Sequence, residues 1–212
     1  MKLTVFGATG GTGLQLVRQA LDLTHEITAV VRDPARLPAE LRPRVDVVRA
    51  DVMDPGAIIS AIEGRDAVVC ALGPRGTGPT TVHSAATRSI VAAMERAGVR
   101  RVLSVGAAGM VADAGDDPFT RYVLKPLVLQ RILRHSFGDL AVAERLLRQS
   151  RLDWTIVRPS RLTDSGRTNR YRTAKDVNLR FGFLTSRADL ADCVLDLIED
   201  RSSVGHVISV AS

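Results

Sequence analysis

The sequence has few cysteines and no long apolar segment. Cys70 and Cys193 lie in separate apolar segments, so neither a disulfide framework nor a metal-binding spacing is indicated. No apolar run approaches the roughly 20 residues that a transmembrane helix requires. The first residues lead directly into a strand pattern rather than a signal peptide. We therefore expect a cytoplasmic protein that holds no metal and does not associate with a membrane.

Lysine and aromatic residues are also scarce. The formal net charge is +6, yet lysine occurs only at Lys2, Lys125 and Lys175, so the positive charge is almost entirely arginine. The arginines are scattered, with no basic run and no aromatic set for stacking bases, which disfavours nucleic-acid binding. A solvated surface with a few arginines facing an anionic cofactor accounts for the charge. The length of 212 residues suits a single domain, 1–212.

The beginning of the sequence combines a strand pattern, a glycine-rich turn and a helix pattern. In this context the turn GATGGTG predicts a site for the diphosphate of a dinucleotide, because the following helix presents free N–H groups. Gly7 permits a tight turn, Gly10 lets the backbone approach the phosphates, and Gly13 lets the helix pack closely. An ordinary glycine loop is the alternative. The predicted cofactor residues here are Gly7, Thr9, Gly10, Gly11, Thr12, Gly13 and Leu14.

Strand and helix patterns then alternate along the chain. The spacing predicts right-handed βαβ units in a Rossmann-type doubly wound, mostly parallel sheet of order 3-2-1-4-5-6. The ligand is expected over the carboxyl ends of the strands. The predicted strands cover residues 26–31, 45–49, 66–72, 101–105, 152–158 and 206–210, and helices begin at Pro55 and after Ser186.

The middle of the chain departs from this simple alternation. Residues 118–136 have a helical pattern, which we expect Pro126 to interrupt because proline lacks the N–H group of a helix hydrogen bond. Residues 137–139 should end this helix, and Asp139 could cap the next one. We expect the substrate-side region to come from about 106–140 and 159–185.

The end of the second strand bears on the choice of dinucleotide. An acidic residue there accepts hydrogen bonds from the ribose hydroxyls of NAD, whereas an arginine pairs with the 2′-phosphate of NADP. The chain has Arg32 at this point, followed by Asp33, with Arg36 one turn away. This pattern favours NADP(H) over NAD(H). Alternatively, Arg32 is a surface residue and Asp33 serves NAD.

Other strand ends supply further candidate cofactor contacts. Asp51 and Val52 are placed to flank the adenine ring, although Asp51 could instead cap a turn. Arg75 could reach a phosphate or the substrate, or could be a solvated loop residue. Backbone is expected to line the cofactor at Ala71, Leu72 and Gly73, and the nicotinamide side is expected at Ser104, Val105 and Gly106.

Several stretches resemble the atypical short-chain dehydrogenase/reductase group that has NmrA-like and biliverdin reductase B (flavin reductase) members. They are GATGGTG at 7–13, VVRDPARLP at 30–38, ADVMDP at 50–55, DAVVCALG at 66–73, PTTVHSAATRSIVAAMERAGVRRVL at 79–103, LDWTIVRPSRLTD at 152–164 and SRADLADCVLDLI at 186–198. The resemblance covers nearly the whole chain. It implies a Rossmann fold that binds NAD(P)H, with Pro159 and Ser160 near the nicotinamide.

The chain departs from the wider group at the positions expected to be catalytic. Typical members use a Tyr-x-x-x-Lys pair for proton transfer. Tyr122 has Pro126 at the lysine position, and Tyr171 matches Lys175 in spacing but lies in a polar segment, so we interpret that match as accidental. A further departure concerns hydroxyl groups: Gly106 and Ala107 stand where relatives often have Ser-Ser. Asp139 and Glu144, by contrast, resemble acidic positions that recur in the substrate-side helix of the family, although they could equally be structural. No catalytic residue is predicted.

The sequence thus favours an NADPH-dependent reductase of a flavin, quinone or similar small planar acceptor. Such an acceptor suits a site without a tyrosine acid, because it can take its proton from water while the cofactor carries the hydride. The alternative is a non-enzymatic, NmrA-like sensor of the NADP redox state that acts through a protein partner. A sugar-nucleotide epimerase is disfavoured by the short segment after the sixth strand. The acceptor and the oligomeric state stay open.

Overall fold

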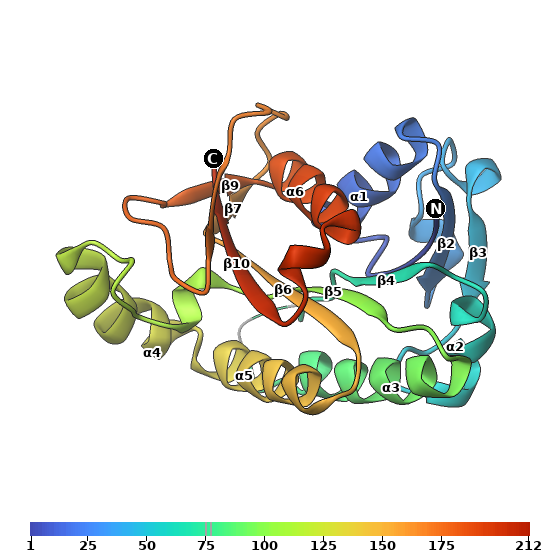
Figure 1. The fold of residues 1–212 in the computed structure, drawn as a ribbon, viewed down its shortest axis with the longest axis horizontal. Coiled ribbons are helices and arrows are strands. Elements are labelled where there is room, and N and C mark those ends of the chain that lie inside the picture. Colours follow the sequence, from blue (N-terminus) through green and yellow to red (C-terminus); the bar gives the residue numbers. More distant parts are fainter. Residues whose placement is uncertain (75, 77) are drawn as a thin grey trace.

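An eight-stranded sheet forms the centre of the computed structural model, which describes residues 1–74, 76 and 78–212 (Figure 1). The strand order is β3-β2-β1-β4-β5-β6-β10-β8, and all neighbours are parallel except β8, which runs antiparallel to β10. The predicted Rossmann-type sheet and its order 3-2-1-4-5-6 are confirmed, with two further strands at one side. The strands are β1 (Lys2–Phe6), β2 (Glu26–Val31), β3 (Asp46–Arg49), β4 (Ala67–Cys70), β5 (Arg101–Val105), β6 (Asp153–Pro159), β8 (Arg172–Lys175) and β10 (His206–Ala211).

Helices cover both faces of the sheet. One layer contains α1 (Gly11–Asp22) and α6 (Arg187–Glu199), which pack together, and the other contains α2 (Pro55–Ile62), α3 (Val82–Ala97) and α5 (Arg134–Gln149) (Figure 1). Local signals mark the start of α2 and the end of α3, as predicted. The Asp54 carboxylate accepts the Gly56 N–H at 2.8 Å at the start of α2, and Gly98 ends α3 with φ +73°.

A separate apolar core lies on each face, because successive strand side chains point to opposite sides. Leu3 and Val5 belong to the core beneath α1 and α6, whereas Phe6 belongs to the core beneath α2 and α3. Each fully buried large side chain contributes about 1.5–3 kcal/mol. Burial raises the pKa of the Cys70 thiol to about 11 and that of Cys193 to about 12, so both thiols stay protonated and unreactive at neutral pH.

The segment after β5 differs from its prediction. Pro126 does not interrupt the helix: η4 (Thr120–Leu129) passes through it as a π-helix, and its hydrogen bonds span five residues, as from the Gln130 N–H to the Lys125 carbonyl. Wider π turns are known at irregular points of helices. The break comes instead at Leu133, between α4 (Gln130–Ile132) and α5, where ψ turns to +17°.

Asp139 caps a helix, but not the predicted one. It lies within α5, which continues through Gly138, and its carboxylate accepts the N–H groups of His83 at 2.8 Å and Ser84 at 3.1 Å. These are first-turn N–H groups of α3, whose own N-cap residue, Thr81, supplies no side-chain hydrogen bond. A side chain 55 residues away along the chain therefore performs the capping function.

The remaining elements are short. η2 and η5 directly precede β3 and β10 and lie at the amino ends of the strands, whereas η1 and η3 follow the carboxyl ends of β2 and β5. In Figure 1, η4 and α4 protrude from the body of the molecule. Within the part of the chain that the structure describes, no helix has the length and apolar character needed to span a bilayer. The short elements are η1 (Pro34–Arg36), η2 (Arg42–Arg44), η3 (Ala108–Met110), η5 (Arg201–Ser203) and the parallel pair β7 (Arg161–Thr163) and β9 (Leu184–Ser186).

Candidate functional site

A cavity of about 520 Å³ lies at the carboxyl ends of β1 to β5. This is the edge at which a doubly wound parallel sheet binds its ligand. Twelve of the predicted cofactor residues line the cavity: Gly7, Thr9, Gly10, Gly11, Thr12, Arg32, Val52, Ala71, Leu72, Gly73, Val105 and Gly106. The structure therefore brings together residues from five separate strand ends.

The glycine-rich turn is sterically restricted at two of its glycines. Gly7 has φ +85°, and a Cβ atom there would lie 2.5 Å from the Ala71 carbonyl oxygen. A Cβ atom on Gly13 would lie 2.1 Å from the Gly7 carbonyl oxygen, so α1 can approach β1 this closely only with glycine at that point. The Gly10 N–H closes the turn on the Gly7 carbonyl at 2.9 Å.

The N-terminus of α1 opens into this cavity. Its N-cap residue is Gly10, no side chain among the described residues caps it, and its first turn carries no acidic residue. The leading N–H groups and the positive end of the helix dipole are thus available to an anion. Together with the close-packed glycines, this arrangement fits the diphosphate of a dinucleotide.

The two candidate residues at the end of β2 have different environments. The Asp33 carboxylate accepts the Ala35 N–H at 3.0 Å and thereby caps η1. Arg32 and Arg36 line the cavity, are exposed, and have no side-chain partner among the described residues. Asp33 also lines the cavity, but one of its carboxylate oxygens is engaged, whereas neither guanidinium has a side-chain partner in the part of the chain that the structure describes.

Some predicted residues do not line the cavity. Asp51 caps a turn by accepting the Met53 N–H at 3.0 Å, which was the alternative interpretation of this residue. Leu14 closes the first turn of α1 through its N–H to Gly10. Arg75 lies outside the described residues. Five predicted cofactor residues that the structure describes lie outside the lining: Gly13, which packs beneath the turn, Leu14, Asp51, Ser104 and Pro159.

The cavity also contains residues that sequence reasoning missed. His83 and Leu140 flank the Asp139 cap, from α3 and α5, and burial lowers the pKa of the His83 ring while the Asp139 charge partly opposes that shift. Arg187, the first residue of α6, lies against the glycine-rich turn. No local pattern signals these positions, because each reaches the cavity from a distant part of the chain.

A buried ion pair supports the end of β5. Arg158 of β6 donates to both carboxylate oxygens of Glu144, at 2.9 Å from Nε and 2.6 Å from Nη2. A Cβ atom on Gly106 would lie 3.1 Å from one of these oxygens, so the backbone rests directly on the pair. Glu144 is therefore structural, as one of its two interpretations held, and glycine at 106 permits the close approach.

A second cavity, of about 300 Å³, lies between η3, η4, β7 and the segment 178–184. Its walls are largely apolar, from Leu124, Leu129, Leu179, Phe183 and Leu184. It shares no lining residue with the first cavity, but the two are neighbours along the chain. Gly106 lines the first and Ala108 the second, and β7 places Leu162 in the first and Arg161 in the second.

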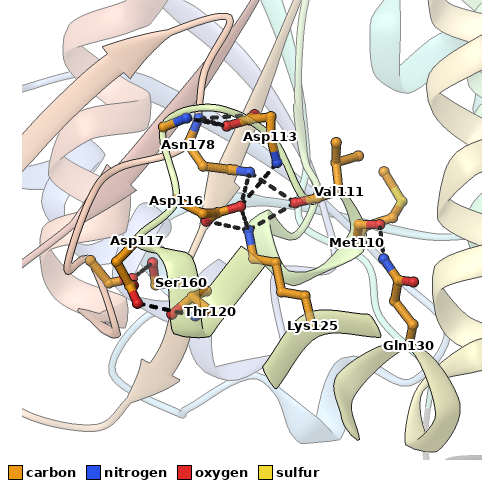
Figure 2. Close-up of polar contacts among 12 residues, drawn as sticks. Met110, Val111, Asp113, Asp116, Asp117, Thr120, Lys125, Gln130, Ser160 and Asn178 are labelled. Atoms are coloured by element: carbon orange, nitrogen blue, oxygen red, sulfur yellow. Dashed lines mark hydrogen bonds and ion pairs between the residues drawn. The ribbon is translucent and has the colours of Figure 1, made fainter. Parts of the chain in front are cut away.

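A buried polar network holds one wall of the second cavity (Figure 2). Lys125 Nζ donates to Asp116 Oδ1 at 2.7 Å and to the Val111 carbonyl at 2.8 Å, and the two charged side chains are only 5% and 4% exposed. Asn178 Nδ2 donates to the same carbonyl at 2.8 Å and to Asp116 at 3.2 Å. Burial lowers the pKa of Lys125, and contact with Asp116 partly offsets this effect.

Neither tyrosine forms a catalytic pair with lysine. The Tyr171 hydroxyl donates to Asp196 at 2.7 Å, and Lys175 Nζ donates to the Ser202 carbonyl at 2.8 Å. Burial and the Asp196 contact raise the pKa of Tyr171. Tyr122 is exposed on η4, and Lys125 belongs to the buried network. The accidental nature of the Tyr171–Lys175 spacing is thus confirmed.

Comparison with known proteins agrees with this geometry. A family model described as NAD(P)H-binding matches residues 7–201. The chain is 29% identical over 217 residues to the uncharacterized protein YwnB of Bacillus subtilis, with 100% of this chain and 99% of that protein covered. A short-chain dehydrogenase/reductase from Veillonella parvula in complex with NADP has a TM-score of 0.83 at 22% identity, covering 100% of this chain and 94% of that chain. ChuY, an anaerobillin reductase from Escherichia coli O157:H7, has a TM-score of 0.81 at 22% identity, covering 100% and 97%. These two structures share the fold of the chain.

Proposed function

The chain belongs to the NAD(P)H-binding family, and from that premise we propose that it is an NADPH-dependent reductase of a small planar acceptor such as a flavin or quinone. The observation that carries the proposal is the pair of neighbouring cavities. The first has the anion-binding features that a dinucleotide needs, and the second has largely apolar walls. The nicotinamide supplies the hydride when it is bound.

In this proposal the first cavity holds the cofactor along its length. The α1 N-terminus takes the diphosphate, Val52 contacts the adenine, and the backbone at Ala71–Gly73 and Val105–Gly106 lines the remainder. Arg32 and Arg36 contact the 2′-phosphate. Preference for NADPH is supported by the state of Asp33, because its carboxylate is already engaged with the Ala35 N–H and is less available to ribose hydroxyls.

The acceptor is assigned to the second cavity. Apolar walls bury the faces of a planar molecule and exclude water, which favours transfer between the two bound rings. Hydroxyl groups are present at the wall: Ser160 Oγ lies in hydrogen-bond distance, 2.5 Å, of the Gly182 carbonyl, and Thr120 Oγ1 is buried without a partner in the described part of the chain.

A specific surface favours the second candidate function, a non-enzymatic NADP sensor. Phe119, Tyr122, Leu127 and Ile132 of the protruding segment are exposed, with Phe119 62% exposed. Apolar groups gathered on one protrusion are typical of a protein-binding surface. Since neither tyrosine contacts a lysine as in a Tyr–Lys pair, this surface suits a protein that reports its cofactor state to a partner.

One experiment separates the two functions. Calorimetric titration with NADPH and NADH is followed by assays of NADPH oxidation with flavins, quinones and dyes. Turnover with any acceptor supports the reductase, whereas tight binding without turnover across the panel supports the sensor. If neither dinucleotide binds, both functions are rejected.

The cofactor preference is tested by Arg32→Ala. We expect NADPH affinity to fall about ten- to a hundredfold, because one charge-assisted contact to phosphate contributes roughly 1.5–3 kcal/mol. NADH affinity should change less than twofold. Arg44→Ala removes an exposed arginine outside the cavity and serves as the matched control. Equal losses for NADPH and NADH would refute the role of Arg32.

A further inference from the structure

Arg187 reaches the glycine-rich turn from the opposite end of the chain. It is the first residue of α6, directly after the N-cap Ser186, whose Oγ accepts the Asp189 N–H at 3.0 Å. Its side chain crosses Gly11 so closely that a Cβ atom there would lie 2.8 Å from both Cδ and Nε of the arginine. The guanidinium therefore lines the dinucleotide cavity beside the α1 N-terminus.

The guanidinium has one anionic partner. Its Nη1 donates to the Asp164 carboxylate at 2.7 Å; the Arg187 side chain is 28% exposed and the Asp164 side chain 88% exposed. Water and salt weaken the pair from the exposed Asp164 side. No acceptor for Nε or Nη2 is found among the described residues, so part of the planar donor set is available to another anion.

Gly11 leaves the room that this contact needs. It stands at the start of α1 with an ordinary negative φ, so its backbone does not require glycine, and alanine is the better helix former. A Cβ atom there would meet the flexible Arg187 side chain, which would have to shift away from the turn. The absence of a side chain at Gly11 lets the arginine lie against the turn.

We propose that Arg187 is a second group that binds the diphosphate of the dinucleotide. It reaches the diphosphate from α6, in addition to the N–H groups at the N-terminus of α1. The inference rests on the proposed dinucleotide function and adds a positioning residue to it. A planar, bidentate donor set matches phosphate oxygens. Asp164 neutralises the guanidinium when no phosphate is present and is displaced from it by the stronger charge of the diphosphate.

This role differs from that of Arg32 in the part of the cofactor that it recognises. Arg32 is assigned to the 2′-phosphate, which only NADPH carries, whereas the diphosphate is common to NADPH, NADH and ADP-ribose. Loss of Arg187 should therefore weaken all three to a similar degree. It should leave binding of 2′-AMP, which has a 2′-phosphate and no diphosphate, unchanged.

The experiment is calorimetric titration of the full chain with these four ligands at two salt concentrations. For Arg187→Ala we expect about a tenfold loss with NADPH, NADH and ADP-ribose, a smaller salt dependence, and partial recovery in Arg187→Lys. For Asp164→Asn we expect a two- to threefold gain, because a competing carboxylate is removed. Unchanged affinity for ADP-ribose in Arg187→Ala overturns the inference. Weaker binding in Asp164→Asn overturns the idea that the diphosphate displaces Asp164 from the guanidinium.

A double-mutant cycle separates a direct contact from a general effect on the fold. Gly11→Ala should weaken binding by displacing the arginine, and it should have no further effect in the Arg187→Ala background. A full additional loss in that background overturns the inference, because Gly11 would then act on the ligand by itself. If the wild-type chain binds none of the ligands, the proposed function fails together with this inference. Wild-type binding that Arg187→Ala does not alter rejects this inference alone.

Discussion

The glycine-rich turn and the segment 106–140 are built by different kinds of constraint. At the turn, backbone meets backbone: Gly13 lies against the Gly7 carbonyl, and Gly7 against Ala71. In the second region, side chains hydrogen-bond to backbone groups of distant segments. The Asn178 amide donates to the Val111 carbonyl, and the Asp139 carboxylate accepts an N–H group of α3. The first region depends on the absence of side chains and the second on particular side chains. Their sensitivity to substitution should differ accordingly.

The largest effect is expected at Lys125. Lys125→Met leaves the Asp116 carboxylate buried without its cation, and loss of one partner of a buried pair costs about 3–5 kcal/mol. We expect the free energy of unfolding to fall by that amount in urea titration. Lys2→Met, at an ion pair that is more than half exposed on each side, is the matched control and should change stability by less than about 0.5 kcal/mol. Equal stability of the two variants would show that the network does not hold the second region.

A smaller loss of stability is expected at Gly13. The Cβ atom of Gly13→Ala would collide with backbone, which cannot move aside as a flexible side chain can, so we expect a cost of about 1–3 kcal/mol. Binding of both dinucleotides should weaken as the turn opens. Gly166→Ala is the control, because a Cβ atom there meets nothing within 4 Å and the residue lines neither cavity. Comparable effects at Gly13 and Gly166, measured by thermal unfolding and titration, would contradict the steric argument.

The smallest effect is expected for a helix cap. Here a capping side chain that is distant along the chain can be compared with one that is adjacent to its helix. Asp139→Ala should destabilise the protein by about 1 kcal/mol, the usual contribution of a capping side chain. Asp54→Ala removes the same kind of cap from α2, where donor and acceptor are two and three residues apart. Hydrogen exchange should show faster opening at the start of α3 in the first variant and at the start of α2 in the second. Protection of α3 that is unaffected by Asp139→Ala would refute the long-range cap.

The same difference explains what the sequence could predict. The sheet order, the caps at Asp54 and Ser186 and the glycine-rich turn depend on periodicity and on neighbours, and the structure has them as predicted. The π-helix through Pro126 and the partner of Asp139 depend on packing between distant segments. Arg187 and His83 reach the cavity for the same reason. A single sequence carries no local signal for such contacts.

The two edge strands of the sheet affect whether sheets of separate molecules can pair. The sheet stops at β3 on one side and at β8 on the other, and each is four residues long. Asp46 and Arg49 delimit the first of these strands, and Arg172 and Lys175 delimit the second. Short strands with charged ends resist the edge-to-edge pairing that leads to aggregation. The fold therefore carries its own protection against extension of the sheet from one molecule to the next, even though its central strands are strongly apolar.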